Sequence, residues 1–234
     1  MLALAALESK SQTTYIPQWQ AWFRYYNQAQ LSERLVLHTE FDERRILNPS
    51  LQSQFFTHVH LHYRVKPWLD VAAGGSYILT NSSVNHSLAV PEWRTWQEAS
   101  LINKFGKEIQ FQFRYRLDER YIHRNDNQVL LEGYHYNWRH RFRIQFSKPI
   151  AKFNNNRILT LKLSEEVMLN TGDVPRLFDQ NRMYASLEIK LNDQWSFESG
   201  YLNLIQPKTD IVFFERNIIR STLYHRIDVR KNRG

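Results

Sequence analysis

Three histidines at alternate positions, His58, His60 and His62, are the residues of this 234-residue chain best placed for metal chemistry. Successive side chains of a β-strand point to opposite faces, so this spacing puts the three imidazoles on one face of a strand. Imidazoles so placed can bind a transition metal. They can equally line a wet interior and hydrogen-bond to Arg or Glu side chains. Since no carboxylate or cysteine lies close by in the sequence, we favour the second interpretation and expect no metal and no cofactor.

Charged residues of both signs also recur at alternate positions. If the strands that carry them close into a narrow barrel, these side chains meet across the interior as Arg–carboxylate pairs, because the guanidinium fork suits a carboxylate and a charge buried alone is costly. The network could be a rigid ionic plug, a pore constriction or a site for an anionic ligand. The predicted interior network comprises Glu40, Asp42, Arg44, Arg64, Glu98, Arg114, Arg116, Arg182 and Glu188.

Nucleophilic catalysis needs a nucleophile, a nearby base and an orienting group. The candidates here are Ser82, Ser83, His86, Ser87 and His140. They form no Gly-x-Ser-x-Gly elbow, and polar residues of a loop are usually surface. We therefore expect binding or passage of a solute rather than catalysis. The pair Gly74-Gly75 lies inside a predicted strand and indicates a bend or close packing, not a phosphate loop.

The elements that position these residues show a period of two. In residues 54–65, apolar side chains such as Val59 and Leu61 alternate with polar ones, and the same pattern returns in residues 34–44, 108–118, 138–146 and 182–191. Such strands need an apolar medium on one face and water or polar partners on the other.

Eleven segments fit this pattern or continue it. They are residues 18–26, 34–44, 54–65, 69–79, 92–103, 108–121, 137–147, 157–167, 181–191, 195–205 and 217–229. Most are about as long as the ~9 to 11 residues that a tilted strand needs to cross a bilayer. Short connections, as at 66–68, 104–107 and 192–194, alternate with longer ones at 80–91, 122–136, 168–180 and 206–216. We expect an all-β fold, a single antiparallel transmembrane β-barrel with short periplasmic turns and longer outer loops.

Single-chain bacterial barrels have an even number of strands. We therefore predict about 12 strands, with 10 as the alternative, and expect residues 11–17 to form an additional strand or to run through the lumen. Aromatic residues near strand ends, such as Trp19, Trp68, Trp93 and Trp138, suit an interfacial girdle.

Composition limits the other classes. The chain carries a formal charge of +8, but Arg and Lys are spread over many strands and mixed with Asp and Glu, which argues against a nucleic-acid surface. The absence of Cys excludes disulfides and thiolate chemistry. We expect residues 1–12 to be a residual signal peptide or disordered leader, and residues 13–234 to form one barrel domain.

Three further motifs are Phe113-Arg-Tyr-Arg-Leu-Asp-Glu-Arg120, Leu163-Ser-Glu-Glu-Val167 and, most recognisably, Phe178-Asp-Gln-Asn-Arg182. These motifs resemble those of the outer-membrane barrel family called domain of unknown function 2490. The resemblance covers roughly residues 14–229. It implies an exported barrel in the outer membrane of a Gram-negative bacterium, and it implies no particular activity.

Together these observations predict an outer-membrane barrel with a structural, pore-like or complex-subunit role, with anions preferred if the pore is continuous. Its expected partners are membrane lipid and lipopolysaccharide, with other envelope proteins as further candidates, and the barrel is expected to be monomeric. The alternatives are an outer-membrane lipid-modifying enzyme and a soluble lipocalin-like ligand-binding barrel.

Overall fold

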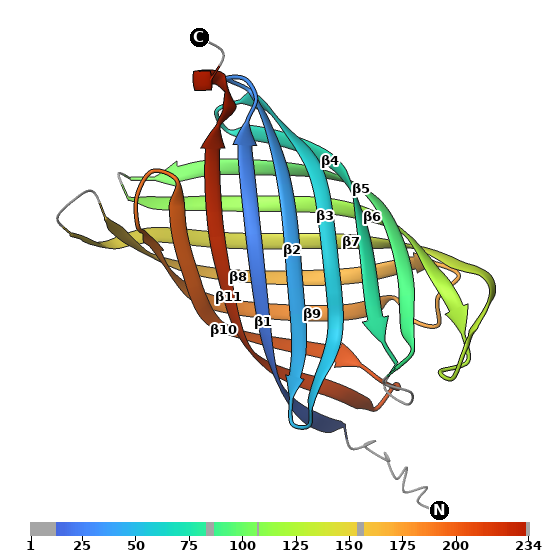
Figure 1. The fold of residues 1–234 in the computed structure, drawn as a ribbon. Helices are drawn as coiled ribbons and strands as arrows, with labels where there is room; N and C mark the ends of the chain where they lie inside the picture. The colour runs from blue at the N-terminus through green and yellow to red at the C-terminus, as the bar shows by residue number, and fades with distance from the viewer. Residues whose placement is uncertain (1–12, 83–86, 107, 154–156, 233–234) are drawn as a thin grey trace, which may run out of the picture.

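The computed structural model describes residues 13–82, 87–106, 108–153 and 157–232. Within these residues, eleven strands form a closed barrel in which each strand pairs with its neighbours along the chain (Figure 1). The strands are β1 Thr14–Gln30, β2 Leu35–Leu47, β3 Ser50–Lys66, β4 Leu69–Asn81, β5 Ala89–Phe105, β6 Ile109–Asn125, β7 Leu130–Lys152, β8 Ile158–Gly172, β9 Phe178–Lys190, β10 Trp195–Pro207 and β11 Val212–Asp228, followed by the short 3₁₀ helix η1 Val229–Asn232. No described helix is long and apolar enough to cross a membrane.

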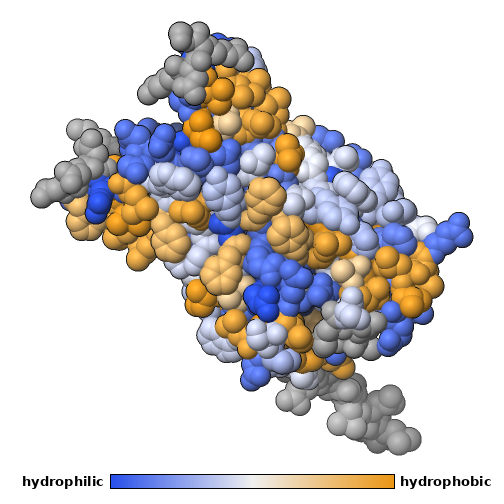
Figure 2. Space-filling view, in the orientation of Figure 1, coloured by the Kyte–Doolittle hydropathy of each residue, from blue (hydrophilic) through white to orange (hydrophobic). Residues whose placement is uncertain are grey.

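The apolar face of the strands is the outer face of the barrel. On β3, Val59 and Leu61 are 55% and 40% exposed, whereas His60 between them is only 4% exposed. The same alternation on β9 leaves Leu187 45% exposed beside the buried Ser186. In Figure 2, apolar side chains cover much of the visible outer wall, interrupted by polar patches. The period-two pattern therefore separates an apolar exterior from a polar interior, as expected of a barrel with a wet lumen.

The strand number is eleven among the described residues, so the prediction of twelve or ten is wrong. Because eleven strands follow one another by simple reversals, the last runs in the same direction as the first. The barrel accordingly closes with a parallel β1–β11 pair, in register from Thr14↔Val212 to Gln30↔Asp228. Residues 14–17 are the beginning of β1 and not an additional strand, and residues 11 and 12 lie outside the described part. The even-number rule describes most bacterial barrels, but a parallel pair satisfies the backbone groups equally well.

The connections at the two ends differ less in length than predicted. Segments expected as long outer loops continue as paired strand, and the remaining connections there are residues 48–49, 82–88, 126–129, 173–177 and 208–211. At the other end they are residues 31–34, 67–68, 106–108, 153–157 and 191–194. Pairing extends outward because each backbone N–H and C=O gains a cross-strand partner; the β8–β9 connection, for example, is closed by Asn170 N–H donating to Leu177 O at 2.7 Å.

Gly74 allows β4 to pack closely against β3 at His60. It lies opposite His60 in the β3–β4 register, and a Cβ atom at Gly74 would collide with the Cβ of His60 and the carbonyl oxygen of Val59. A Cβ at Gly75 would meet only the carbonyl oxygen of Arg94 at 3.7 Å, an ordinary contact. Close packing, one of the two predicted roles of the glycine pair, therefore applies to Gly74.

Candidate functional site

A cavity of about 1530 Å³ occupies the barrel interior. Its lining includes Asn48 and Asn127 from connections at one end and Asp193 and Gln194 from a connection at the other. The hollow thus reaches both ends of the barrel. Between them its wall is formed by the inward side chains of the strands, which are mostly polar or charged.

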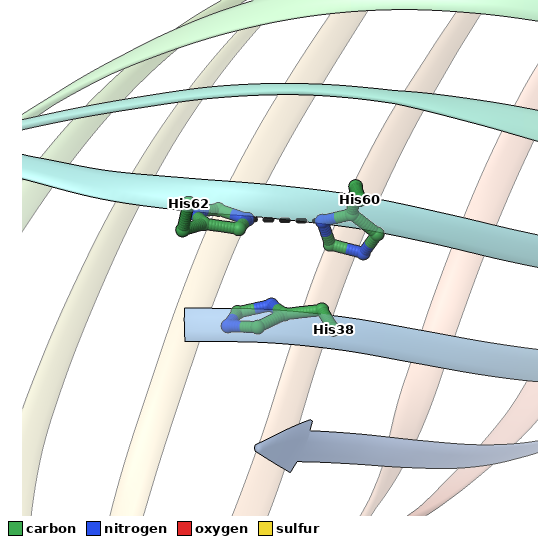
Figure 3. A group of neighbouring side chains, drawn as sticks. All are labelled: His38, His60 and His62. Atoms are coloured by element: carbon green, nitrogen blue, oxygen red, sulfur yellow. Dashed lines mark hydrogen bonds between the residues drawn. The ribbon is translucent and has the colours of Figure 1, made fainter. Parts of the chain in front are cut away.

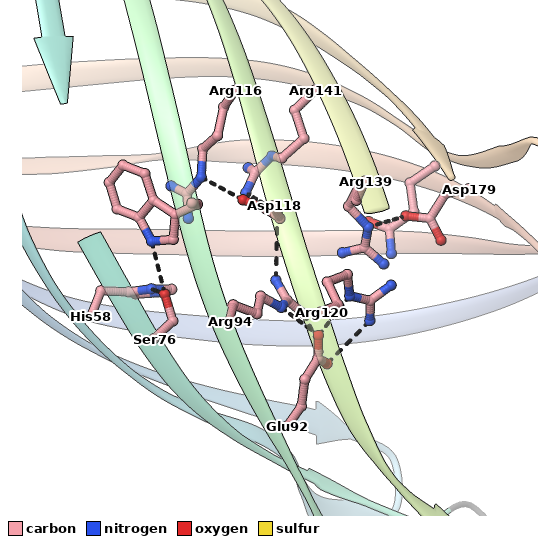
Figure 4. Close-up of polar contacts among 12 residues, drawn as sticks. His58, Ser76, Glu92, Arg94, Arg116, Asp118, Arg120, Arg139, Arg141 and Asp179 are labelled. Carbon is pink, nitrogen blue, oxygen red and sulfur yellow. Dashed lines mark hydrogen bonds and ion pairs between the residues drawn. The ribbon is translucent and has the colours of Figure 1, made fainter. Parts of the chain in front are cut away.

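A bidentate cluster surrounds Glu92 on β5 (Figure 4). Its Oε1 accepts hydrogen bonds from Nε of Arg94 at 2.5 Å and Nε of Arg120 at 2.6 Å, and its Oε2 accepts from the Nη2 atoms of the same residues at 3.0 and 3.1 Å. The two guanidinium groups come from adjacent strands, because Arg94 lies opposite Arg120 in the β5–β6 register. The carboxylate offsets the repulsion that two facing cations would otherwise have.

Asp118 on β6 is fully buried and lies among three cations, one of which, Arg94, also belongs to the Glu92 cluster. Its carboxylate is 2.7 Å from Arg116, 3.6 Å from Arg141 and 4.0 Å from Arg94 (Figure 4). Arg116 in turn lies over the ring of Trp96, 3.6 Å from the ring centroid. The arrangement holds Arg116 against the wall, since its guanidinium has both a charge partner and a packing surface.

Glu166 on β8 extends the network around the lumen. It pairs with Arg141 at 3.0 Å, with Arg182 at 3.8 Å and with Arg114, and Arg114 also lies 3.5 Å from Glu98. Four strands are therefore joined through a single carboxylate and its partners.

A separate group lies on β8 to β11. Lys162 pairs with Glu188 at 2.5 Å and with Glu198 at 2.7 Å, and Arg226 lies 3.3 Å from Glu188. The hydroxyl of Tyr224 donates to Glu198 at 3.0 Å. This group is balanced in charge, with two cations and two carboxylates.

Cations nevertheless exceed carboxylates along the cavity. Its lining holds sixteen Arg and Lys against nine Asp and Glu. Three more carboxylates, Asp118, Asp179 and Glu188, pair with lining arginines, and the excess remains positive.

Four lining arginines form no ion pair with any described residue: Arg64, Arg143, Arg216 and Arg220. Arg143 donates to Gln112 at 3.2 Å and Arg216 to Gln18 at 3.1 Å, while the guanidinium of Arg220 lies 5.3 Å from the ring centroid of Tyr184. Neutral amides and an aromatic face leave Arg143, Arg216 and Arg220 without a carboxylate at ion-pair distance, and in this sense their charges are uncompensated. They are the positions at which an anion gains most from entering the lumen.

Of the nine residues predicted for the interior network, eight line the cavity. These are Glu40, Asp42, Arg44, Arg64, Glu98, Arg114, Arg116 and Arg182. Glu188 adjoins it through Lys162 and Arg226. Arg44 pairs with Asp42 and lies over Trp22, 3.7 Å from the ring centroid.

The prediction missed several members, chiefly Glu92, Arg94, Arg139, Arg141, Asp179 and Glu198. Most of them could have been assigned to the interior because they lie at alternate positions of a strand; Glu92 and Arg94, for example, share one face of β5 with the predicted Glu98. Asp179, which pairs with Arg139 at 2.8 Å, belongs to the Phe178–Arg182 motif.

The structure separates the three predicted histidines. Nδ1 of His58 lies 2.5 Å from the Ser76 hydroxyl, which also accepts a hydrogen bond from the indole N–H of Trp96 at 3.1 Å. His60 and His62 instead adjoin His38 on β2 (Figure 3). Strand β2 pairs with β3 so that His38 lies opposite His60, a relation that spacing along one strand cannot reveal.

The candidate hydrolase residues are not brought together in the described structure. Ser82 donates to the carbonyl oxygen of Asn127 at 3.1 Å, and His140 lies on the outer face between Tyr115 at 2.9 Å and Thr171 at 3.1 Å. Ser83 and His86 lie outside the described residues. The Ser76 hydroxyl and the His58 imidazole are arranged like a nucleophile and its base. The Ser76 side chain is nevertheless buried, contacts the rings of His58 and Trp96 and does not line the cavity. A substrate therefore has no approach to its oxygen.

Comparison with known proteins identifies the family of this chain. The model of the family described as "Protein of unknown function (DUF2490)" matches residues 19–212. Among solved structures, the crystal structure of the beta domain of the Bordetella autotransporter BrkA is similar, with a TM-score of 0.46 and 8% sequence identity over 74% of this chain and 78% of that chain. No curated protein matches the sequence.

Proposed function

The chain belongs to the DUF2490 family, and from this premise we propose that it is a monomeric barrel of the bacterial outer membrane whose arginine-rich lumen admits anionic solutes. The observation that carries the proposal is the cavity itself, which reaches both ends of the barrel and is lined by sixteen cations against nine carboxylates.

The outer face supports a membrane location. Ile144 and Phe146 on β7 are 40% and 43% exposed, and Ile219 on β11 is 45% exposed. A closed barrel satisfies every backbone donor and acceptor between strands, which is the condition for a sheet to cross hydrocarbon. The strands are 13 to 23 residues long, so each exceeds the ~9 to 11 residues needed to span it.

Polar groups on the outer face are paired with one another. Thr95 donates to Glu119 at 3.2 Å, and Asn203 donates to Glu215 at 3.2 Å. Each pair crosses between adjacent strands, which lowers the cost of placing carboxylates on a face that otherwise meets lipid or lipid headgroups. The exposed Trp19, Trp93 and Trp138 suit the interface with membrane lipid and lipopolysaccharide.

The first test concerns the membrane. Cell fractionation should place the full-length protein with the outer membrane, and the protein should stay monodisperse only in detergent. Recovery in the soluble fraction as a stable monomer would support the lipocalin-like alternative instead.

The second test is the reversal potential of the purified barrel in a planar bilayer under a salt gradient. We expect conductance with anions preferred over cations, because the uncompensated arginines raise the local anion concentration. Arg143→Gln combined with Arg216→Gln should reduce this preference. The control is Arg45→Gln, which like either interior substitution alone removes one positive charge, here from an outer-face residue 43% exposed in its side chain. An electrically silent barrel would contradict the proposal and support the ionic plug.

A further inference from the structure

A histidine cluster lies at the interior face of β2 and β3, close to the β3–β4 turn (Figure 3). One ring nitrogen from each of His38, His60 and His62 lies within 4.8 Å of the others. Nε2 of His62 is 3.0 Å from Nδ1 of His60, and the rings of His38 and His62 stack with centroids 4.1 Å apart. All three side chains line the cavity.

The remaining nitrogen of each imidazole has an oxygen partner. Nδ1 of His62 lies 2.5 Å from the Asp70 carboxylate, Nε2 of His60 lies 2.9 Å from Glu40, and Nδ1 of His38 lies 2.5 Å from the Tyr26 hydroxyl. Metal-binding histidines commonly donate their second N–H to such a carboxylate or other acceptor, which selects the tautomer and orients the ring. The outer contacts that a three-histidine centre requires are therefore built into four adjacent strands, β1 to β4.

The contact between His60 and His62 requires a proton or a metal ion between the two facing nitrogens. When His60 and His62 each donate one N–H to a carboxylate, their two facing nitrogens present lone pairs to each other at 3.0 Å. Two lone pairs repel at this distance unless a proton or a metal ion lies between them. A metal bound by His38 as well would satisfy all three inner nitrogens at once.

From this arrangement we propose that His38, His60 and His62 bind one divalent transition metal ion of the zinc class. Imidazole ligands favour Zn²⁺, Cu²⁺, Ni²⁺ and Co²⁺ over Mg²⁺ and Ca²⁺, which prefer oxygen. Two nitrogens on a tetrahedral Zn²⁺ lie about 3.3 Å apart, so nitrogens now separated by as much as 4.8 Å must approach by up to about 1.5 Å. The His38 ring must also rotate out of its stack with His62, because a metal binds each imidazole in the plane of its ring. The fourth position opens on the cavity, where water or an anionic solute can occupy it.

The proposal replaces His58, predicted from spacing, with His38. His58 is held by Ser76 at 2.5 Å and is not part of the cluster. It therefore provides a matched control, since it is an interior histidine on the same strand face. The proposal is independent of solute passage, and its test measures metal binding and not conductance.

The test is a titration of the EDTA-treated, detergent-solubilised full chain with Zn²⁺ by calorimetry, and with Co²⁺ by visible absorption. We expect one Zn²⁺ per chain, and Co²⁺ bands of the intensity typical of four-coordinate nitrogen and oxygen ligands. His38→Gln, His60→Gln and His62→Gln should each remove the binding, whereas His58→Gln should retain it.

Two further variants keep the test decisive if a histidine variant does not fold. Asp70→Asn and Tyr26→Phe leave the three imidazoles in place and alter only their outer contacts, so we expect affinity to fall by about 10- to 100-fold. The proposal is overturned if the folded wild-type barrel shows neither heat nor Co²⁺ bands, or if binding is lost in His58→Gln and retained in His62→Gln.

Discussion

Two interior carboxylates, Glu92 and Glu166, each accept four hydrogen bonds from two guanidinium groups, those of Arg94 and Arg120 for Glu92 and those of Arg114 and Arg141 for Glu166. Alternation along the chain predicts which residues face inward, because it depends only on the pleat. It cannot predict which cation meets which carboxylate, because that depends on the register between strands. This is why Arg114 and Glu98 could both be assigned to the interior from the sequence, while their pairing between β6 and β5 could not.

Replacement of Glu92 by Gln tests the energetic importance of this bonding. The variant removes the carboxylate that Arg94 and Arg120 share and leaves the more distant Asp118, 4.0 Å from Arg94, as the remaining ion-pair partner among the described residues, so we expect the free energy of unfolding to fall by about 3 kcal/mol or more. Urea unfolding of the folded barrel in lipid vesicles, followed by tryptophan fluorescence, measures this loss. Glu119→Gln is the control: this outer-face carboxylate accepts only from Thr95, and its replacement should cost less than about 1 kcal/mol. Equal losses would mean that the interior pairs are solvated and contribute little.

The sequence is most informative about the positions of individual strands. Residues 54–65 were predicted as strand and lie inside β3, Ser50–Lys66, and residues 138–146 lie inside β7. The other alternating segments, 34–44, 108–118 and 182–191, agree with β2, β6 and β9 except for one residue at one end. The strand ends are less accessible to prediction, since residues such as Leu130 and Leu131 become part of β7 only because β6 offers them backbone partners. Long-range pairing also decides that His38 meets His60 and that β11 meets β1, and neither relation leaves a local pattern.

The β3–β4 pair permits a sharp prediction at this scale. Gly74→Ala places a methyl group against the backbone of His60 and Val59, so the two strands must move apart, and we expect a loss of about 1 to 3 kcal/mol in the free energy of unfolding. Gly75→Ala meets only an ordinary contact at 3.7 Å and should be neutral, or stabilising by up to about 1 kcal/mol because alanine restricts the unfolded chain. Thermal and urea unfolding of the two variants side by side provide the comparison. A neutral Gly74→Ala would show that the strands tolerate a wider separation at His60.

For the molecule as a whole, one inference connects the fold to the proposed function, namely that the exposed apolar wall contacts lipid. The alternation predicts an apolar face, but the same pattern serves a soluble barrel with its apolar face turned inward. The exposure of Leu61 and Leu187 together with the burial of His60 and Asp118 distinguishes the two arrangements, because the charged face is the enclosed one. The number of strands, in contrast, depends on how the first and last strands pair to close the barrel, and no single segment of the sequence predicts it.

Leu187→Arg tests this wall directly. Leu187 is 45% exposed and lies beside Leu161 in the β8–β9 register, within the apolar part of the outer face. In a bilayer an arginine on the lipid face near the midplane costs about 2 to 4 kcal/mol, whereas on a water-exposed surface the same change is nearly neutral. The control is Val129→Arg, in the connection between β6 and β7, where the side chain is 54% exposed and should tolerate the charge within about 0.5 kcal/mol. Unfolding titrations in lipid vesicles should therefore show a large loss for Leu187→Arg alone; if both variants are neutral, the apolar wall does not contact hydrocarbon and the membrane location must be abandoned.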